Sequence, residues 1–208
     1  HLSKNSKIST LRRRLVSISM FHKLKGHYLD TKHPIIIENL MGIRRVKGSI
    51  QIGKKPILIN HLKSIINVIN EQKIEEIKKA RDKTIILIGF GGGFRRTELI
   101  SIDHEDLEFV PEGLKISIRR SKTDQYGEGM IKGLPYFTNP NYCPVANLKN
   151  WLQISKIKSG PIFRRFSKGS YLSENRLTDQ SVVLLMKEYL KIAGIENINF
   201  AGHSLRSG

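Results

Sequence analysis

Cysteine and long apolar runs are scarce in this sequence of 208 residues. Its single cysteine, Cys143, excludes an internal disulfide framework and a cysteine-based zinc site, which is consistent with a reducing cytosol. The longest apolar stretch, residues 84–90, is far shorter than the roughly 20 residues that cross a bilayer. We therefore expect a cytoplasmic protein with no membrane segment. No initial methionine or signal-like stretch is present, and we expect the sequence to be incomplete at both ends.

Acidic side chains are also few, with 18 against 36 basic ones and a formal net charge of +18 at pH 7. This excess exceeds what solubility alone favours and predicts a polyanionic partner. Residues 1–60 hold 13 of the basic side chains but only two acidic ones. Because attraction to phosphate carries no sequence information, charge alone leaves ribosomal RNA, duplex DNA and anionic lipid open.

The apolar content of 39% suffices for a buried core, and its periodicity predicts an α+β fold. Helical spacing is found in residues 8–25, 34–41, 61–77, 81–90, 144–154 and 178–192. Short alternating segments at 107–110, 114–119 and 130–135 predict a three-stranded antiparallel sheet. A segment rich in glycine, lysine and proline, 49–56, is interpreted as a linker between a helical DNA-binding unit, 1–48, and a mainly helical catalytic domain, 57–208.

Basic residues cluster on the two predicted amino-terminal helices without acidic neighbours. A run of charged residues usually marks only the solvent-exposed face of a helix. Two basic helices without acidic neighbours, however, favour contact with DNA. The candidate DNA-binding residues, which include others in the linker and at the end of the second strand, are Arg12, Arg13, Arg14, Arg44, Arg45, Lys54, Lys55, Arg119 and Arg120.

Three glycines at 91–93 precede Phe94, Arg95 and an acidic residue, Glu98. Neither the Gly-Lys-Ser/Thr of a nucleotide-binding loop nor the dinucleotide fingerprint is present, so nucleotide binding is not expected. A tight helix packing or a helix break could instead direct Arg95 into a cleft, with Glu98 one turn later to orient a neighbour. A surface ion pair explains Glu98 equally well.

Two further elements are weak signals when taken singly. Lys122 lies in a predicted hairpin loop and could reach a bound backbone, but an exposed lysine at a sheet edge is the commoner explanation. His203 and Arg206 are three residues apart and could grip one phosphate from a first helical turn. Taken by itself, that pair is better explained as a surface arginine beside a core histidine.

Taken in order, the three elements resemble the tyrosine recombinase family of phage-type integrases. They read Gly-x-Arg-x-x-Glu-Leu at 93–99, Ser-Lys-Thr-Asp at 121–124 and Gly-His-Ser-Leu-Arg at 202–206. The resemblance covers nearly the whole chain. Further segments that resemble the family's connecting helix and loop, and the latter part of its helical core-binding domain, are 143–151, 160–163, 10–15 and 42–45.

The resemblance implies that a tyrosine attacks a DNA phosphate, giving a 3′-phosphotyrosine bond without a metal ion or other cofactor. Arg95 and Arg206 match the residues whose planar guanidinium groups stabilise the phosphorane charge. Lys122 matches the general acid that protonates the leaving 5′-oxygen, and His203 a residue that hydrogen-bonds the phosphate or assists proton movement. Glu98 matches an acidic residue that supports the site.

In the family the nucleophilic tyrosine follows the last motif, whereas all six tyrosines here precede Arg206. Tyr126 lies in the lysine loop, but its order and setting are wrong. We therefore expect no nucleophile in this chain and no cleavage of DNA by these 208 residues alone.

A decayed bacterial or phage integrase that only binds DNA is the alternative, and a type IB topoisomerase is disfavoured by the integrase-like segments. The resemblance implies a homotetramer on duplex DNA for a complete protein and a monomer for this chain.

Overall fold

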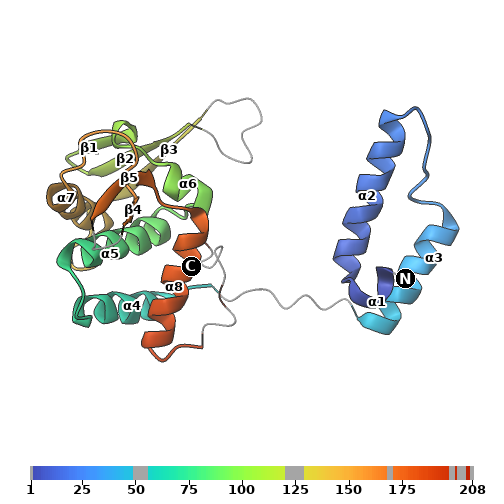
Figure 1. Ribbon diagram of the computed structural model, residues 1–208, viewed down its shortest axis with the longest axis horizontal. Coiled ribbons are helices and arrows are strands. Elements are labelled where there is room, and N and C mark those ends of the chain that lie inside the picture. Colours follow the sequence, from blue (N-terminus) through green and yellow to red (C-terminus); the bar gives the residue numbers. More distant parts are fainter. Residues whose placement is uncertain are drawn as a thin grey trace. The chain divides into compact units, whose positions relative to one another are not determined.

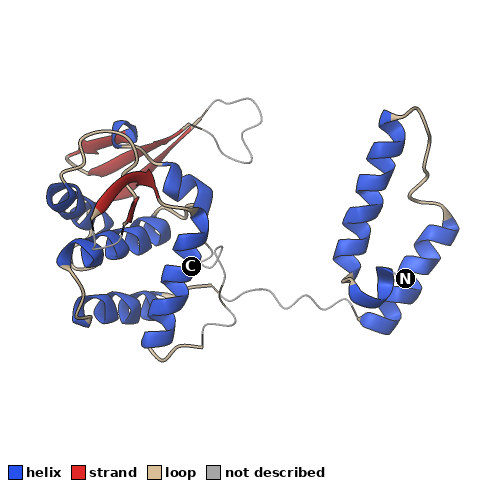
Figure 2. Cartoon of the chain, viewed as in Figure 1, coloured by secondary structure: helices blue, strands red, loops and turns tan. Residues whose placement is uncertain are grey.

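The computed structural model describes residues 2–48, 56–119, 129–167, 171–196, 200 and 205–206. The chain divides into two compact units, His1–Gly53 and Lys54–Gly208 (Figure 1). The division falls within the segment 49–56 that the sequence predicts to be a linker, and residues 49–55 lie outside the described part of the chain. In the described residues, strands occur only in the second unit (Figure 2).

The described residues of the first unit form three helices, α1 (Leu2–Asn5), α2 (Ile8–Leu24) and α3 (Pro34–Lys47). His33 caps α3, since its side chain accepts a hydrogen bond from the backbone N–H of Ile35, and Pro34 occupies the first helical position. The helix continues six residues beyond the end that the sequence predicts. Its last turn is basic, and cations there interact favourably with the helix dipole.

The second unit contains four long helices: α4 (Ile59–Glu71), α5 (Glu76–Gly91), α7 (Pro144–Ser155) and α8 (Asp179–Ile192). A six-residue helix, α6 (Arg96–Ser101), and a 3-10 turn, η1 (His104–Asp106), follow α5. The expected single helix over 61–77 is wrong, because α4 ends at Glu71 and Gln72 is extended. The break allows α5 to turn back and pack against α4, which buries the apolar face of α4.

The predicted three-stranded antiparallel sheet is confirmed, with β1 (Leu107–Val110), β2 (Gly113–Ile118) and β3 (Met130–Pro135) in the order β1-β2-β3. A second, two-stranded sheet pairs β4 (Arg164–Phe166) with β5 (Leu172–Arg176). The sequence analysis missed this hairpin because its strands are short and polar and lack apolar alternation. The fold is α+β, as expected.

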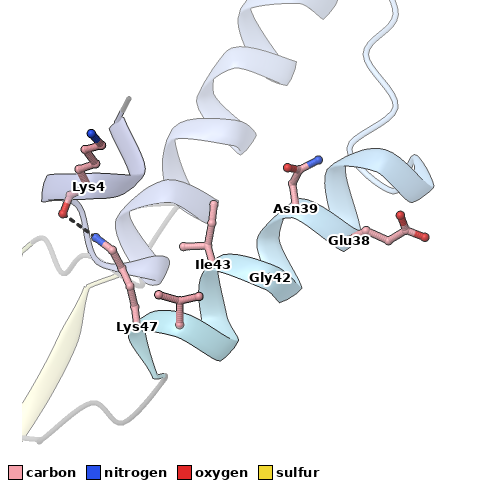
Figure 3. Close-up of a pocket in the computed structure, with 7 residues that line it drawn as sticks. Lys4, Glu38, Asn39, Gly42, Ile43 and Lys47 are labelled. Atoms are coloured by element: carbon pink, nitrogen blue, oxygen red, sulfur yellow. Dashed lines mark hydrogen bonds between the residues drawn. The ribbon is translucent and has the colours of Figure 1, made fainter.

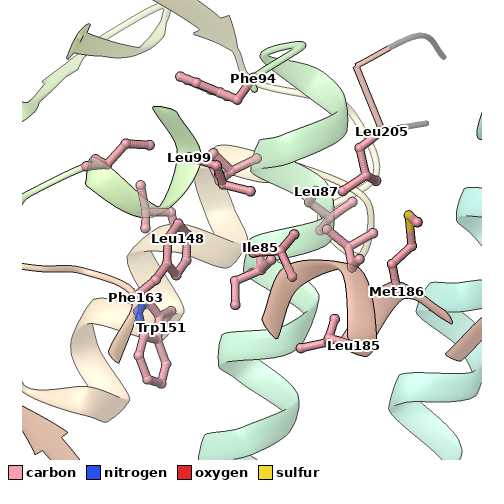
Figure 4. Close-up of a cluster of buried hydrophobic side chains, with 14 of the residues drawn as sticks. Ile85, Leu87, Phe94, Leu99, Leu148, Trp151, Phe163, Leu185, Met186 and Leu205 are labelled. Atoms are coloured by element: carbon pink, nitrogen blue, oxygen red, sulfur yellow. The ribbon is translucent and has the colours of Figure 1, made fainter. Parts of the chain in front are cut away.

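Helix α5 forms the centre of the core, packing against α4, α6, α7 and α8. Residues 85–88 are all buried, as expected of a helix that is covered on every side. Trp151 of α7 packs in the same cluster, and its indole N–H donates to the carbonyl oxygen of Ile162 at 2.8 Å. Side chains from α5, α6, α7, α8 and the segments after them meet in this cluster (Figure 4): Ile85, Leu87, Phe94, Leu99, Leu148, Trp151, Phe163, Leu185, Met186 and Leu205.

Gly113→Ala is expected to destabilise the second unit by about 1–3 kcal/mol through overpacking. A Cβ atom at Gly113 would lie 2.0 Å from the carbonyl oxygen of Leu134 on the neighbouring strand, and backbone cannot move aside cheaply. Urea denaturation followed by circular dichroism measures the loss. Gly133→Ala is the matched control, since nothing lies within 4 Å of a Cβ atom there. Equal midpoints for the two variants would contradict the prediction.

Candidate functional site

The site begins where α5 ends, at the run of three glycines. Gly93 has a left-handed φ of 54°, and two hydrogen bonds close the turn: Phe94 N–H to Gly89 O and Gly93 N–H to Phe90 O, both 3.2 Å. These two bonds and the left-handed residue form a Schellman motif, which ends a helix abruptly and favours glycine. The helix break expected from the sequence is therefore present, and Arg95 follows it directly.

Arg95 occupies the N-cap position of α6, where Glu98 holds it at two points. The Glu98 carboxylate accepts a hydrogen bond from the backbone N–H of Arg95 at 2.9 Å and pairs with its guanidinium Nη1 at 2.6 Å. The side chain of Glu98 is only 3% exposed, whereas that of Arg95 is 20% exposed. The pair between Glu98 and Arg95 is therefore not a surface ion pair. The carboxylate of Glu98 is buried and fixes the direction of a partly accessible arginine.

Arg206 reaches the same turn from the other end of the chain. Leu205 is buried in the core, and its Cδ1 would lie 3.4 Å from a Cβ atom placed on Gly89 of α5. The carbonyl oxygen of the exposed Arg206 would be 4.0 Å from a Cβ atom placed on Gly93. Packing of Leu205 against α5 therefore brings Arg206 to the turn that carries Arg95.

Lys132 of β3 is a third cation at this turn, and the sequence analysis missed it. Its ammonium donates to the carbonyl oxygens of Gly92 at 2.7 Å and Gly93 at 3.1 Å. Burial lowers the pKa of Lys132; Glu98 opposes this shift, whereas the positive charges of Arg206 and Arg95 add to it. A usable signal existed, because Lys132 precedes the buried Leu134 by two residues and so lies on the inner face of the strand.

Several residues of the predicted site lie outside the described part of the chain. Lys122 and His203 are among them, as are the candidate DNA-binding residues Lys54, Lys55 and Arg120. Arg119 is described, and its guanidinium pairs with Asp106 at 2.7 Å and with Asp103 at 3.6 Å. Arg119 therefore has partners within the protein, although its side chain is 62% exposed.

The five amino-terminal arginines of the predicted DNA-binding set are all exposed on the surface of the first unit. In the same unit, Lys47 donates to the carbonyl oxygens of Lys4 at 2.8 Å and Ser6 at 3.2 Å. This contact closes one end of a hollow along α3 that Glu38, Asn39 and Gly42 also line (Figure 3). Among the described residues, the exposed lysine and arginine side chains of this unit form no ion pair with an acidic side chain. They are therefore available to a polyanion.

Within the ranges described, no three His, Cys, Asp or Glu side chains are grouped so that they could hold a metal ion. The helices of those ranges include none with the length and apolarity to cross a membrane.

The model of the phage integrase family matches residues 57–208. The chain is 39% identical over 210 residues to an "integrase/recombinase xerD homolog" of Selenomonas ruminantium, and it spans 61% of the length of that curated relative.

Solved structures of recombinases share the fold. A XerH site-specific recombinase bound to its difH substrate has a TM-score of 0.53 at 17% identity, with 98% of this chain and 58% of that chain covered. A XerA recombinase has a TM-score of 0.52 at 16% identity, covering 92% and 64%. A lambda integrase dimer bound to a COC′ core site has a TM-score of 0.52 at 12% identity, covering 98% and 56%.

Proposed function

Because the chain belongs to the phage integrase family of tyrosine recombinases, we propose that it acts in site-specific DNA recombination, breaking and rejoining strands through a 3′-phosphotyrosine intermediate. The observation that carries this proposal is that the backbone of Arg206 lies beside Gly93, in the glycine turn after α5 that Arg95 follows. Two guanidinium groups directed at one phosphate can donate to both non-bridging oxygens as negative charge grows there. The buried Glu98 keeps Arg95 in place before DNA binds.

The remaining catalytic roles are proposed from the family resemblance. Lys122 would protonate the leaving 5′-oxygen, and His203 would hydrogen-bond the phosphate or assist proton movement. The covalent intermediate conserves the energy of the phosphodiester bond, so rejoining requires no ATP, and no cofactor is proposed.

Tyr189 does not suit the role of nucleophile. It is buried, its hydroxyl donates to Asp82 at 2.8 Å, and burial raises its pKa, all of which oppose a phenolate. We propose that the nucleophile is a tyrosine on the C-terminal side of the Arg206 motif, as in the family. The alternative proposal is a chain that binds DNA and does not cleave it.

A nicked suicide substrate separates these two proposals. The nick lets the strand segment beside the cleavage site diffuse away, which traps the covalent protein–DNA adduct. A complete recombinase should give an adduct that survives denaturing electrophoresis. Its absence in a complete protein that still binds the site would leave only the DNA-binding proposal.

Duplex DNA is the proposed partner, and the exposed arginines of α2 are expected to contribute to its binding. The triple variant Arg12→Ala/Arg13→Ala/Arg14→Ala should flatten the slope of log K against log salt by about 2–3, since each phosphate contact contributes about 0.9. Fluorescence anisotropy with a labelled duplex over a sodium chloride series measures this slope.

A control variant removes the same number of charges elsewhere. Lys78, Lys79 and Lys115 pair with Glu75, Glu76 and Glu108, so their replacement by alanine should change the slope much less. Equal slopes for both triple variants would show that α2 does not bind the duplex. We further propose that a complete protein forms a tetramer on two DNA sites and that these 208 residues alone are monomeric.

A further inference from the structure

We propose that Lys132 is a positioning residue for the two-arginine phosphate site, and that it acts by holding the Gly92–Gly93 turn from which Arg95 emerges. The inference rests on the proposed function, because it assumes that Arg95 binds a phosphate. The structure shows a lysine on the inner face of β3 whose ammonium reaches the end of a helix in another layer of the unit.

The contact lies where a helix end most needs a donor. The last carbonyl groups of an α-helix have no partner within the helix, and the dipole places partial negative charge on them. Directly after α5, the carbonyl oxygens of its C-cap Gly92 and of Gly93 accept from the same ammonium at 2.7 and 3.1 Å. Two of the three donors of Lys132 are therefore used within the protein, which favours a supporting role over direct binding of phosphate.

Phe94 adds a second point of attachment for the turn. The Lys132 ammonium lies 4.4 Å from the centroid of the buried Phe94 ring, within the range of a cation–π interaction. The ring also lies so close to Gly92 that a Cβ atom there would be 2.1 Å from it. The ring therefore contacts both the glycine backbone and the lysine.

The turn requires such support because of its composition. Three successive glycines lose more conformational freedom on folding than any other residues, so the turn is easily loosened. Arg95 is two residues after Gly93, and the Arg206 backbone lies beside Gly93. A loosened turn would therefore weaken the preorganisation of both arginines, on which stabilisation of a phosphorane depends.

The test is a titration of the 208-residue chain with inorganic phosphate, followed by NMR of the Arg95 and Arg206 side chains and of the Gly92 and Gly93 amides. Lys132→Met should weaken phosphate binding at Arg95 by about tenfold, as expected for the loss of charge-assisted hydrogen bonds. It should also broaden or shift the two glycine amide signals. Lys132→Arg, which keeps the charge and the donors, should recover part of both effects.

Lys115→Met is the matched control. Lys115 lies on the neighbouring strand β2 and pairs with Glu108, so its replacement removes the same charge without touching the turn. If Lys132→Met and Lys115→Met behave alike, the inference is wrong. If Lys132→Met loses phosphate affinity while the glycine amides stay as in the wild type, the lysine acts through charge alone and positioning is again excluded.

Failure of the proposed function would look different. The wild-type chain would then show no saturable response of Arg95 or Arg206 to phosphate or to a duplex. The glycine amides of Lys132→Met would still report whether the lysine holds the turn, and unchanged amides would overturn that part as well.

Discussion

Arg206→Ala in a complete protein is expected to reduce the rate of DNA strand cleavage by about 10²–10³-fold, the usual cost of removing one donor to a developing oxyanion. Affinity for duplex DNA should change little, because many other cations of this highly basic chain contribute to it. Arg206→Lys should not restore the rate, since an ammonium cannot donate in the planar, two-pronged manner of a guanidinium. Single-turnover cleavage of the nicked substrate measures the rate, and anisotropy measures the affinity.

Arg165→Ala provides the control for Arg206→Ala. Arg165 is exposed on β4, and its replacement removes one positive charge away from the turn that carries Arg95. It should cleave at the wild-type rate. If Arg206→Ala lost binding and cleavage in the same proportion, Arg206 would only position the duplex, and its proposed role in the transition state would be wrong.

Trp151→Ala is expected to destabilise the second unit by about 3–5 kcal/mol, the typical cost of emptying a large aromatic site in a core. Trp151 is completely buried against the core around α5, and its indole N–H satisfies the Ile162 carbonyl oxygen. The alanine variant would lose the apolar contacts and leave that oxygen without its donor. Urea denaturation should be followed by circular dichroism, because Trp151 is the only tryptophan and its fluorescence would be lost.

Two further variants divide the effect of Trp151→Ala. Trp151→Phe keeps most of the packing but removes the donor, so it should cost about 1–3 kcal/mol. Tyr171→Ala removes a large ring that is 76% exposed and should change stability by less than about 0.5 kcal/mol. A Trp151→Ala variant as stable as Tyr171→Ala would show that α7 is not anchored through this side chain.

Local signals in the sequence predicted most of the helices and the main sheet. The limits of β1 and β3 were predicted because alternation and turn residues operate over a few neighbours. The division between α4 and α5 was not, since apolar residues continue at helical spacing through Ile74 and Ile77 while the chain turns. The turn at Gln72 becomes favourable only because α5 gains a partner by packing back on α4. The β4–β5 hairpin was not predicted for a similar reason, because its polar strands pair without a local apolar pattern.

The proposed phosphate site shows the same division between sequence and structure. Arg95 and Glu98 are one helical turn apart, so their relation could be inferred from spacing, although spacing left a surface ion pair equally open. The burial of the Glu98 side chain in the structure excludes the surface ion pair. The spacing of Lys132 and Leu134 indicated the inner face of the strand, but it could not reveal the partners of Lys132, because the carbonyl oxygens of Gly92 and Gly93 carry no residue-specific signal and lie far from it in the chain.

The sequence by itself determined the family of this protein, its strongly basic character, and the identity of the two arginines that we propose to bind phosphate. These properties depend on residue types and on short-range spacing, both of which are known from the sequence. Only the tertiary structure decided that Lys132 and the backbone of Arg206 lie at the glycine turn that precedes Arg95, and that Glu98 is buried against Arg95. That arrangement depends on packing between distant segments, above all on Leu205 against α5, and burial of apolar surface is a property of the folded chain rather than of any local pattern.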